Sequence, residues 1–320
     1  MTDQMRRVVV DGLGRRLALS LCASLCAALV SGPALAQSVA GSAELAHVPS
    51  NASIVGYADV REVMVSNLWA RLRQHAGDDF DGFRVERLGL DLEHDIDTVL
   101  AFLAPGATPE QPAGMALLRG RFDMARLEGA AREAGASVSE YAGARIVVIE
   151  GDDARELAMA AVEPGLVAVG DLATVQRAVD RQADGSDVTA NAEVMALLDR
   201  VAAGSHVWAV GRFDDLSALG MLPDGLPIQL PAVNAFAISG RVDSGVSGSL
   251  EIEGRDDETG QHLRDLLRGV LAIAQSQVAE HAELQALVDS VELGGSGTTA
   301  TVSFNLRSET LDLVFAAAAP

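Results

Sequence analysis

The chain has 320 residues, of which 24 are basic and 45 acidic, with a formal net charge of −21, and every basic residue is an arginine. The absence of lysine excludes Schiff-base catalysis and a phosphate-loop lysine. A strongly acidic chain without basic runs is also a poor ligand for nucleic acid or anionic lipid, so neither partner is expected.

Residues 1–36 follow the pattern of a secretory signal peptide. Four arginines precede the uncharged apolar run 17–30, a helix-breaking stretch follows at 31–33, and Ala34 and Ala36 supply the small residues of a cleavage site. The apolar run is short for a bilayer span, which needs about 20 residues. We therefore expect general secretion to the periplasm or beyond, with cleavage after Ala36. A retained N-terminal anchor is the alternative.

Cleavage changes the chemistry of the chain. Cys22 and Cys26 are the only cysteines, and both would leave with the signal, together with four arginines and two aspartates. The remaining chain would carry 20 basic and 43 acidic residues, a net charge of −23, and no thiol. Disulfides and thiolate zinc sites are therefore excluded from the processed protein. No segment after the signal reaches membrane-spanning length.

One local pattern recurs along the chain: a short apolar strand runs into an aspartate, and a helix begins there. The aspartate side chain can cap the free N–H groups of the first helical turn and favours the positive end of the helix dipole. A Gly-Arg-Phe-Asp or Gly-Arg-Asp-Asp sequence occurs at three of these junctions, 120–123, 211–214 and 254–257, and indicates an internal repeat. The expected capping residues are Asp59, Asp123, Asp171, Asp214 and Asp256.

Alternating apolar patterns around turn residues predict antiparallel hairpins between these units. The five predicted hairpins pair 98–104 with 114–120, 137–141 with 145–150, 157–162 with 166–170, 235–242 with 248–253, and 291–293 with 299–306. Together with the helices, they predict an α+β fold of antiparallel sheets with helices packed on one face. We expect two related lobes, 37–152 and 153–320.

The clearest single element is a helix over 258–281. Its apolar residues form one stripe at helical spacing, and arginines and glutamines lie opposite, so we expect the stripe to pack on the sheet. The stripe consists of Leu263, Leu266, Leu267, Val270, Leu271, Ala274 and Val278.

Signals for catalysis are few. The sequence contains no Gly-x-Ser-x-Gly, no His-Glu-x-x-His and no dinucleotide-binding glycine pattern, and its six histidines are scattered. We predict no catalytic residue and no cofactor. The densest polar cluster lies at 78–97, where alternate acidic residues resemble the start of a calcium loop, but Ile96 replaces the required glycine and Phe102 the bidentate glutamate. A solvated turn is the favoured interpretation, and the weak metal candidates are Asp91, Glu93, Asp95 and Asp97.

Residues 48–60, Val-Pro-Ser-Asn-Ala-Ser-Ile-Val-Gly-Tyr-Ala-Asp-Val, resemble the start of the processed chain in a broad group of uncharacterised exported bacterial proteins. The stretch Gly-Leu-Asp-Leu-Glu-His-Asp-Ile-Asp-Thr-Val at 89–99 and the Gly-Arg-Phe-Asp junctions are similar in style. The resemblance implies a repeated α+β fold outside the cytoplasm and no established activity, and it carries over no functional residue.

Three functions agree with these observations. The first is a non-enzymatic, soluble protein of the periplasm or cell envelope that binds an envelope protein or a small ligand, or has a structural role. The second is an extracytoplasmic hydrolase that uses carboxylates or a cation near 78–97. The third is a carrier that holds a small apolar ligand between sheet and helices.

Overall fold

The computed structural model describes residues 40–76, 94–108, 111–133, 135–150, 156–180, 187–213, 232–279 and 282–311. The predicted signal peptide, Asp214 and residues 78–93 of the acidic cluster lie outside the described residues.

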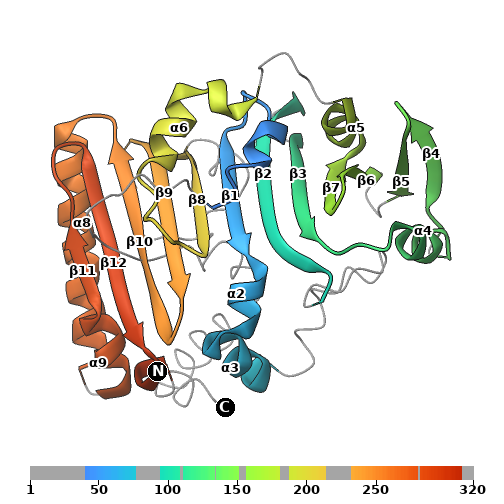
Figure 1. The fold of residues 1–320 in the computed structure, drawn as a ribbon. Helices are drawn as coiled ribbons and strands as arrows, with labels where there is room; N and C mark the ends of the chain where they lie inside the picture. Colours follow the sequence, from blue (N-terminus) through green and yellow to red (C-terminus); the bar gives the residue numbers. More distant parts are fainter. Residues whose placement is uncertain are drawn as a thin grey trace, which may run out of the picture.

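A single antiparallel sheet of 12 strands forms the centre of the molecule (Figure 1). The strand order across it is β11-β12-β10-β9-β8-β1-β2-β3-β7-β6-β5-β4. Helices lie along the chain between groups of antiparallel strands, which confirms the predicted α+β class. The strands are β1 (Ile54–Asp59), β2 (Ile96–Thr108), β3 (Gln111–Gly120), β4 (Ser137–Tyr141), β5 (Ala144–Glu150), β6 (Glu156–Glu163), β7 (Leu166–Asp171), β8 (Val207–Arg212), β9 (Val233–Val242), β10 (Gly245–Gly254), β11 (Val291–Gly294) and β12 (Thr299–Arg307).

The described helical elements are the 3-10 turns η1 (Glu44–His47) and η4 (Val188–Ala190) and the helices α2 (Val60–Val65), α3 (Asn67–Ala76), α4 (Met124–Glu133), α5 (Leu172–Asp180), α6 (Ala192–Leu198), α8 (Asp257–Gln277) and α9 (Ala282–Asp289). Helices α2, α4, α5 and α8 follow the ends of strands, as the junction pattern predicts.

Four of the five predicted capping aspartates lie in the described chain, and all four cap a helix. The Asp59 and Asp123 carboxylates accept hydrogen bonds from backbone N–H groups three residues later, at 3.0 and 3.1 Å. Asp171 and Asp256 do the same at 2.9 and 2.8 Å. A carboxylate at this position satisfies an N–H group that would otherwise lack a partner in the first turn.

All five predicted hairpins are present as antiparallel neighbours: β2–β3, β4–β5, β6–β7, β9–β10 and β11–β12. A two-residue turn joins β4 to β5 through Ala142 and Gly143, with φ angles of +48° and +81°. Positive φ at both central residues is typical of a type I′ turn, whose twist matches that of the flanking strands.

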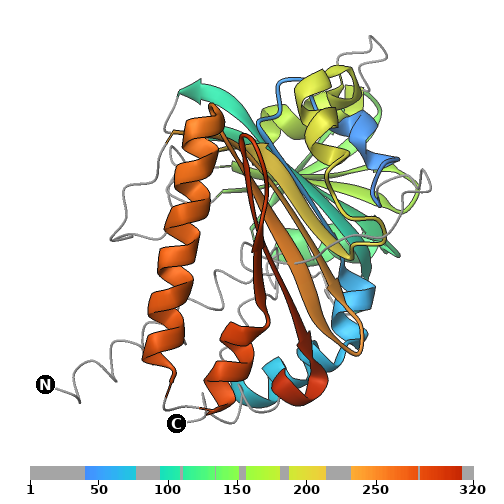
Figure 2. The ribbon, with the colours of Figure 1, turned by 90° about the vertical axis from the view of Figure 1, so that its left-hand side faces the viewer.

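The expectation that helices pack on one face of the sheet is wrong. Leu117 and Leu118 are adjacent in β3 and so point to opposite faces, and each is part of a different buried cluster. Leu117 shares its cluster with residues of η1, α5 and α6, whereas Leu118 shares its cluster with Leu127 of α4. Figure 2 shows α6 on one side of the sheet and α8 on the other. We call these sides the α6 face and the α8 face.

One sheet runs through both predicted lobes. The predicted boundary at residue 152 falls between β5 and β6, which pair directly, with Ile146 opposite Ala160. The middle of the sheet is instead the antiparallel pair β1–β8, where Tyr57 lies opposite Trp208. After β1 the chain forms α2 and α3, the hairpin β2–β3, helix α4 and the hairpin β4–β5. After β8 the described elements are the hairpin β9–β10, helices α8 and α9, and the hairpin β11–β12.

Candidate functional site

The acidic cluster does not present free carboxylates where it is described. Arg126 of α4 donates to the Asp95 carboxylate at 2.7 Å, and Arg61 of α2 pairs with Asp97. Two arginines from two helices therefore neutralise the two aspartates. The local sequence does not reveal this pairing. Of the four metal candidates, Asp91 and Glu93 lie outside the described residues. Within the described ranges, no group of three or more histidine, cysteine or acidic side chains could hold a metal ion.

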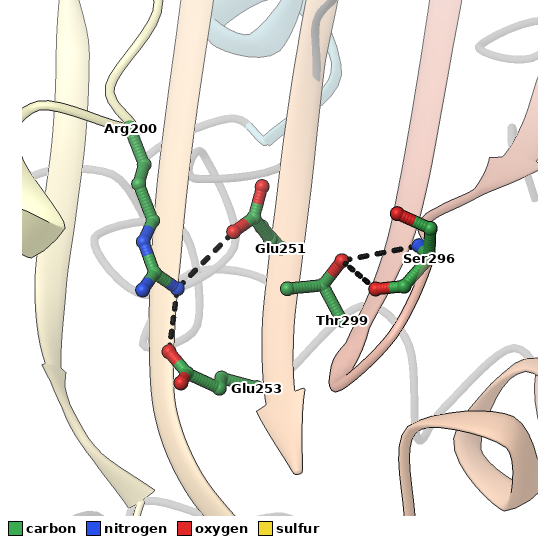
Figure 3. Close-up of polar contacts among 5 residues, drawn as sticks. All are labelled: Arg200, Glu251, Glu253, Ser296 and Thr299. Carbon is green, nitrogen blue, oxygen red and sulfur yellow. Dashed lines mark hydrogen bonds and ion pairs between the residues drawn. The ribbon is translucent and has the colours of Figure 1, made fainter. Parts of the chain in front are cut away.

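Polar side chains gather on the outer end of the α6 face, over β9, β10 and β12. The paired residues Ser239, Ser249 and Ser303 lie side by side on three neighbouring strands. Figure 3 shows the margin of this region, where Arg200 donates to Glu251 at 3.2 Å and to Glu253 at 2.6 Å. These ion pairs tie the end of α6 to β10. A polar sheet face of this kind is common in antiparallel sheets and needs no ligand.

The Thr299 hydroxyl in the same view is hydrogen-bonded to the backbone of its own turn. Thr299 Oγ1 accepts from the Ser296 backbone N–H at 3.2 Å and donates to the Ser296 carbonyl at 2.9 Å (Figure 3). Neither residue is hydrogen-bonded to a histidine or a carboxylate in these contacts, so the arrangement closes the β11–β12 hairpin and does not activate a nucleophile.

A pair of stacked aromatic side chains, Tyr57 and Trp208, lies on the α6 face. Tyr57 and Trp208 stack with ring centroids 5.8 Å apart, and both are buried. Residues 40–48, which we call the N-terminal strap, pack over this pair and bury Leu45 and Val48 with it. Burial, with smaller contributions from the Asp59 and Glu44 carboxylates, raises the pKa of Tyr57 to about 12. The strap thus occupies the aromatic surface that a sugar or peptide ligand would need.

The α8 face has a different character. Side chains that lie directly opposite one another on neighbouring strands form one row across the whole sheet, and every member is apolar or glycine. This apolar row consists of Val138, Val147, Met159, Val169, Ala116, Ala101, Gly56, Ala209, Ile238, Leu250, Val302 and Leu293.

Only the ends of the apolar row lie beneath described helices. Helix α4 packs on β4 and β5 and buries Val147 and Met159, whereas α8 packs on β10, β11 and β12. Between them, Ala101 is exposed in the middle of the sheet, and Gly56 and Ala209 are only partly buried. The centre of the row therefore consists of small residues that meet solvent, over four strands that span about 14 Å.

Helix α8 covers its end of the sheet incompletely. Leu263, near its N-terminus, is 1% exposed, but Val270 and Ile273 are 42% and 60% exposed. The prediction that the stripe forms a core contact along the whole helix is therefore wrong for Val270. No charged residue occurs between Gly269 and Ala279, so the second half of α8 presents an uncharged, apolar side to solvent.

The apolar row is the surface that sequence reasoning missed. Each strand shows the alternation that places its residues in the row, but the row becomes visible only when the strands are put in register. One local signal was available: Gly56 interrupts the β1 pattern Ile-Val-Gly-Tyr-Ala. A Cβ atom at Gly56 would make only ordinary contacts, 3.5 Å from the Trp208 carbonyl oxygen and 3.6 Å from Ala209 Cβ, so the backbone itself does not require glycine.

Comparison with known proteins gives a distant structural likeness. No family model and no curated protein matches the sequence. The solved structure of crystal form I of TP0453 is similar with a TM-score of 0.43 and 12% identity, and the match covers 85% of this chain and 96% of that chain. Among the described helices, none is both long and apolar enough to cross a membrane.

Proposed function

We propose that this is a non-enzymatic protein of the periplasm or cell envelope, exported by its N-terminal signal, that binds an apolar ligand on the α8 face. The observation that carries the proposal is the apolar row, which extends over twelve strands and is open at Ala101. Exposed apolar area of this kind marks binding surfaces, because leaving it in water costs about 25 cal/mol per Å².

The chemistry of the surface selects the class of ligand. The apolar row contains no hydrogen-bonding side chain, so a sugar, nucleotide or polar peptide would leave its own donors and acceptors unsatisfied there. A hydrocarbon chain has no donors or acceptors and therefore loses no hydrogen bond in this contact. We therefore assign the ligand as a molecule with an acyl or comparable hydrocarbon chain, lying over the small residues Ala116, Ala101, Gly56 and Ala209.

Gly56 supports this position for the ligand. Glycine inside a strand costs roughly 0.5–1 kcal/mol relative to alanine, and it often marks a place where a ligand approaches the backbone closely. Because no positive φ and no close internal neighbour demands glycine here, an approaching ligand supplies a reason for it.

The order of the strands and helices along the chain supports the same position for the ligand. We infer that residues 54–150 and 207–307 are related units that meet at β1 and β8, each with the helix that follows its first hairpin, α4 or α8, on the α8 face. This refines the expected pair of lobes, with β6, β7, α5 and α6 inserted between the units. The proposed ligand then lies at the junction of the two units, between their equivalent helices.

A binding titration tests the proposal. The processed chain, residues 37–320, is titrated with a fluorescent long-chain fatty acid, and we expect saturable binding. In Ala101→Glu, a carboxylate would have to be covered by the hydrocarbon chain, which should weaken binding by at least about tenfold.

The matched control places the same charge on the other face. Ser249 lies on β10 in the polar part of the α6 face. The variant Ser249→Glu should leave the fatty-acid affinity unchanged. Absence of saturable binding, or an equal loss in both variants, would contradict the proposal. Ala101 is exposed and Ser249 is partly exposed, so a thermal melt should show each variant folded.

A further inference from the structure

The contacts of the first half of α8 fix the direction in which each side of the helix faces. Arg264 donates to the carbonyls of Gly297 and Thr299 at 2.9 and 2.6 Å, in the hairpin that joins β11 to β12 at the outer edge of the sheet. Leu263 lies in a buried cluster that includes Val233 of β9, which is nearer the centre of the sheet. The side of α8 that carries Arg264 therefore faces the outer edge, and the opposite side faces β9 and β8.

Three apolar side chains occupy that opposite side. Because an α-helix turns about 100° per residue, Val270 and Leu266 lie about 120° and 160° around the axis from Arg264, on the same side as Leu263. Ile273 lies about 180° from Arg264. We call Leu266, Val270 and Ile273 the helix flank. Val270 and Ile273 are 42% and 60% exposed, and Leu266 is partly exposed. The exposed apolar side of α8 is thus turned toward the open centre of the apolar row.

The neighbouring charges of α8 lie away from the helix flank. Arg264 is bound to the β11–β12 hairpin, and Arg268 pairs with Asp265 at 2.5 Å. Both Arg268 and Asp265 lie within about 100° of Arg264, on the side of the helix that is turned away from Leu263. A ligand against the helix flank therefore meets hydrocarbon and not the ion pair.

The shape of this region favours a narrow ligand over a protein surface. The open centre lies between α4 and α8 on the same face of the sheet, and a helix with its side chains is about 10–12 Å in diameter. A flat protein surface would rest on the two helices and would not reach Ala101 or Gly56. The two large exposed side chains of the helix flank also supply far less area than the roughly 800 Å² per partner that a stable protein interface buries.

We infer that the helix flank is a second wall of the ligand site, and that a single hydrocarbon chain lies along it, parallel to α8. Beneath the chain lie Ile238 and Ala209, paired members of the apolar row on the strands next to those that α8 covers. From Leu266 to Ile273 the wall extends about 10 Å along the helix. The chain is then removed from water on two sides, which strengthens binding with each methylene group in contact. This inference rests on the function proposed above.

The fatty-acid titration tests the inference with substitutions on α8. In Ile273→Glu, a carboxylate stands where the hydrocarbon chain should contact the helix, so the Kd should rise at least about tenfold. Ile273→Leu keeps the apolar contact and should bind like the unaltered chain. Because Ile273 is 60% exposed, a thermal melt should show both variants folded.

Gln275→Glu is the matched control. Gln275 is exposed and lies two residues further along α8, about 160° around the axis from Ile273. The variant adds the same charge on the side that faces away from the proposed site and should leave the Kd unchanged. A fatty acid with a photoreactive diazirine on its chain should label residues 266–273 as well as β8 and β9, as read by mass spectrometry of the peptides.

The possible failures can be told apart. Equal affinities for Ile273→Glu and Gln275→Glu, or labelling confined to the strands, would overturn the second wall; the proposed function would then still stand on the loss of binding in Ala101→Glu. Absence of saturable binding to the unaltered chain would remove the proposed function, and this inference with it.

Discussion

Many polar side chains in this chain act by hydrogen bonding to backbone groups at the starts of helices and in turns. The capping aspartates are visible in the sequence because the cap is a local interaction, three residues long. Their ion-pairing counterparts are not visible: Asp95 and Asp97 are neutralised by Arg126 and Arg61, which lie 31 and 36 residues away. For that reason the sequence could suggest a cation site at 91–97 and could not exclude it.

The turn at Ala142 and Gly143 gives the first prediction. Ala142 adopts a left-handed conformation that costs an alanine roughly 1 kcal/mol, and asparagine tolerates this conformation better. Ala142→Asn should therefore raise the free energy of unfolding in urea by about 0.5–1 kcal/mol. Gly143→Ala is the opposite control and should lower it by about 1 kcal/mol; a destabilised Ala142→Asn would show that the turn is of another type.

The two tyrosines give the second prediction. The pKa of Tyr57 is raised to about 12 by burial and by neighbouring carboxylates, and that of Tyr141 is raised mainly by its hydrogen bond to Asp180. A raised pKa stabilises the fold fully below the unfolded value, near 10, and this contribution is lost as the pH rises toward 12. Tyrosinate absorbance should develop late in an alkaline titration, and Tyr57→Phe should lose less stability than the unaltered protein above pH about 10.

At the scale of elements, the sequence predicts each hairpin because a hairpin is a local pairing, fixed by alternation and turn residues. It does not predict which helix face is buried, since that depends on strands far along the chain. Helix α8 illustrates the difference. Its stripe is regular over its whole length, yet the sheet covers Leu263 and leaves Val270 42% exposed.

The third prediction follows from the increase in exposure of apolar side chains along α8. Leu263→Ala should cost about 2–5 kcal/mol of unfolding free energy, because it removes a buried side chain from the cluster with Val233 and Ala300. Ile273→Ala should cost less than about 0.5 kcal/mol, because most of its side chain is already in water. Equal costs, measured by urea unfolding, would mean that the second half of α8 is packed as tightly as the first.

At the scale of the whole molecule, the sheet has two faces with different roles. The α6 face is closed in its centre by the N-terminal strap, α5 and α6, whereas the α8 face leaves its apolar centre open. The sequence supplied the apolar residues of each strand and the α+β class. It could not supply the junction of β1 with β8, whose paired residues are about 150 positions apart, and the open surface exists only at that junction.

Native mass spectrometry of the protein purified from its own cells tests the central claim most directly. The account predicts that the processed chain carries a bound molecule with a hydrocarbon chain, that Ala101→Glu loses it, and that Ser249→Glu retains it. A processed protein that appears at its bare mass, or an adduct that Ala101→Glu retains in full, would contradict the assignment of the α8 face as a binding surface.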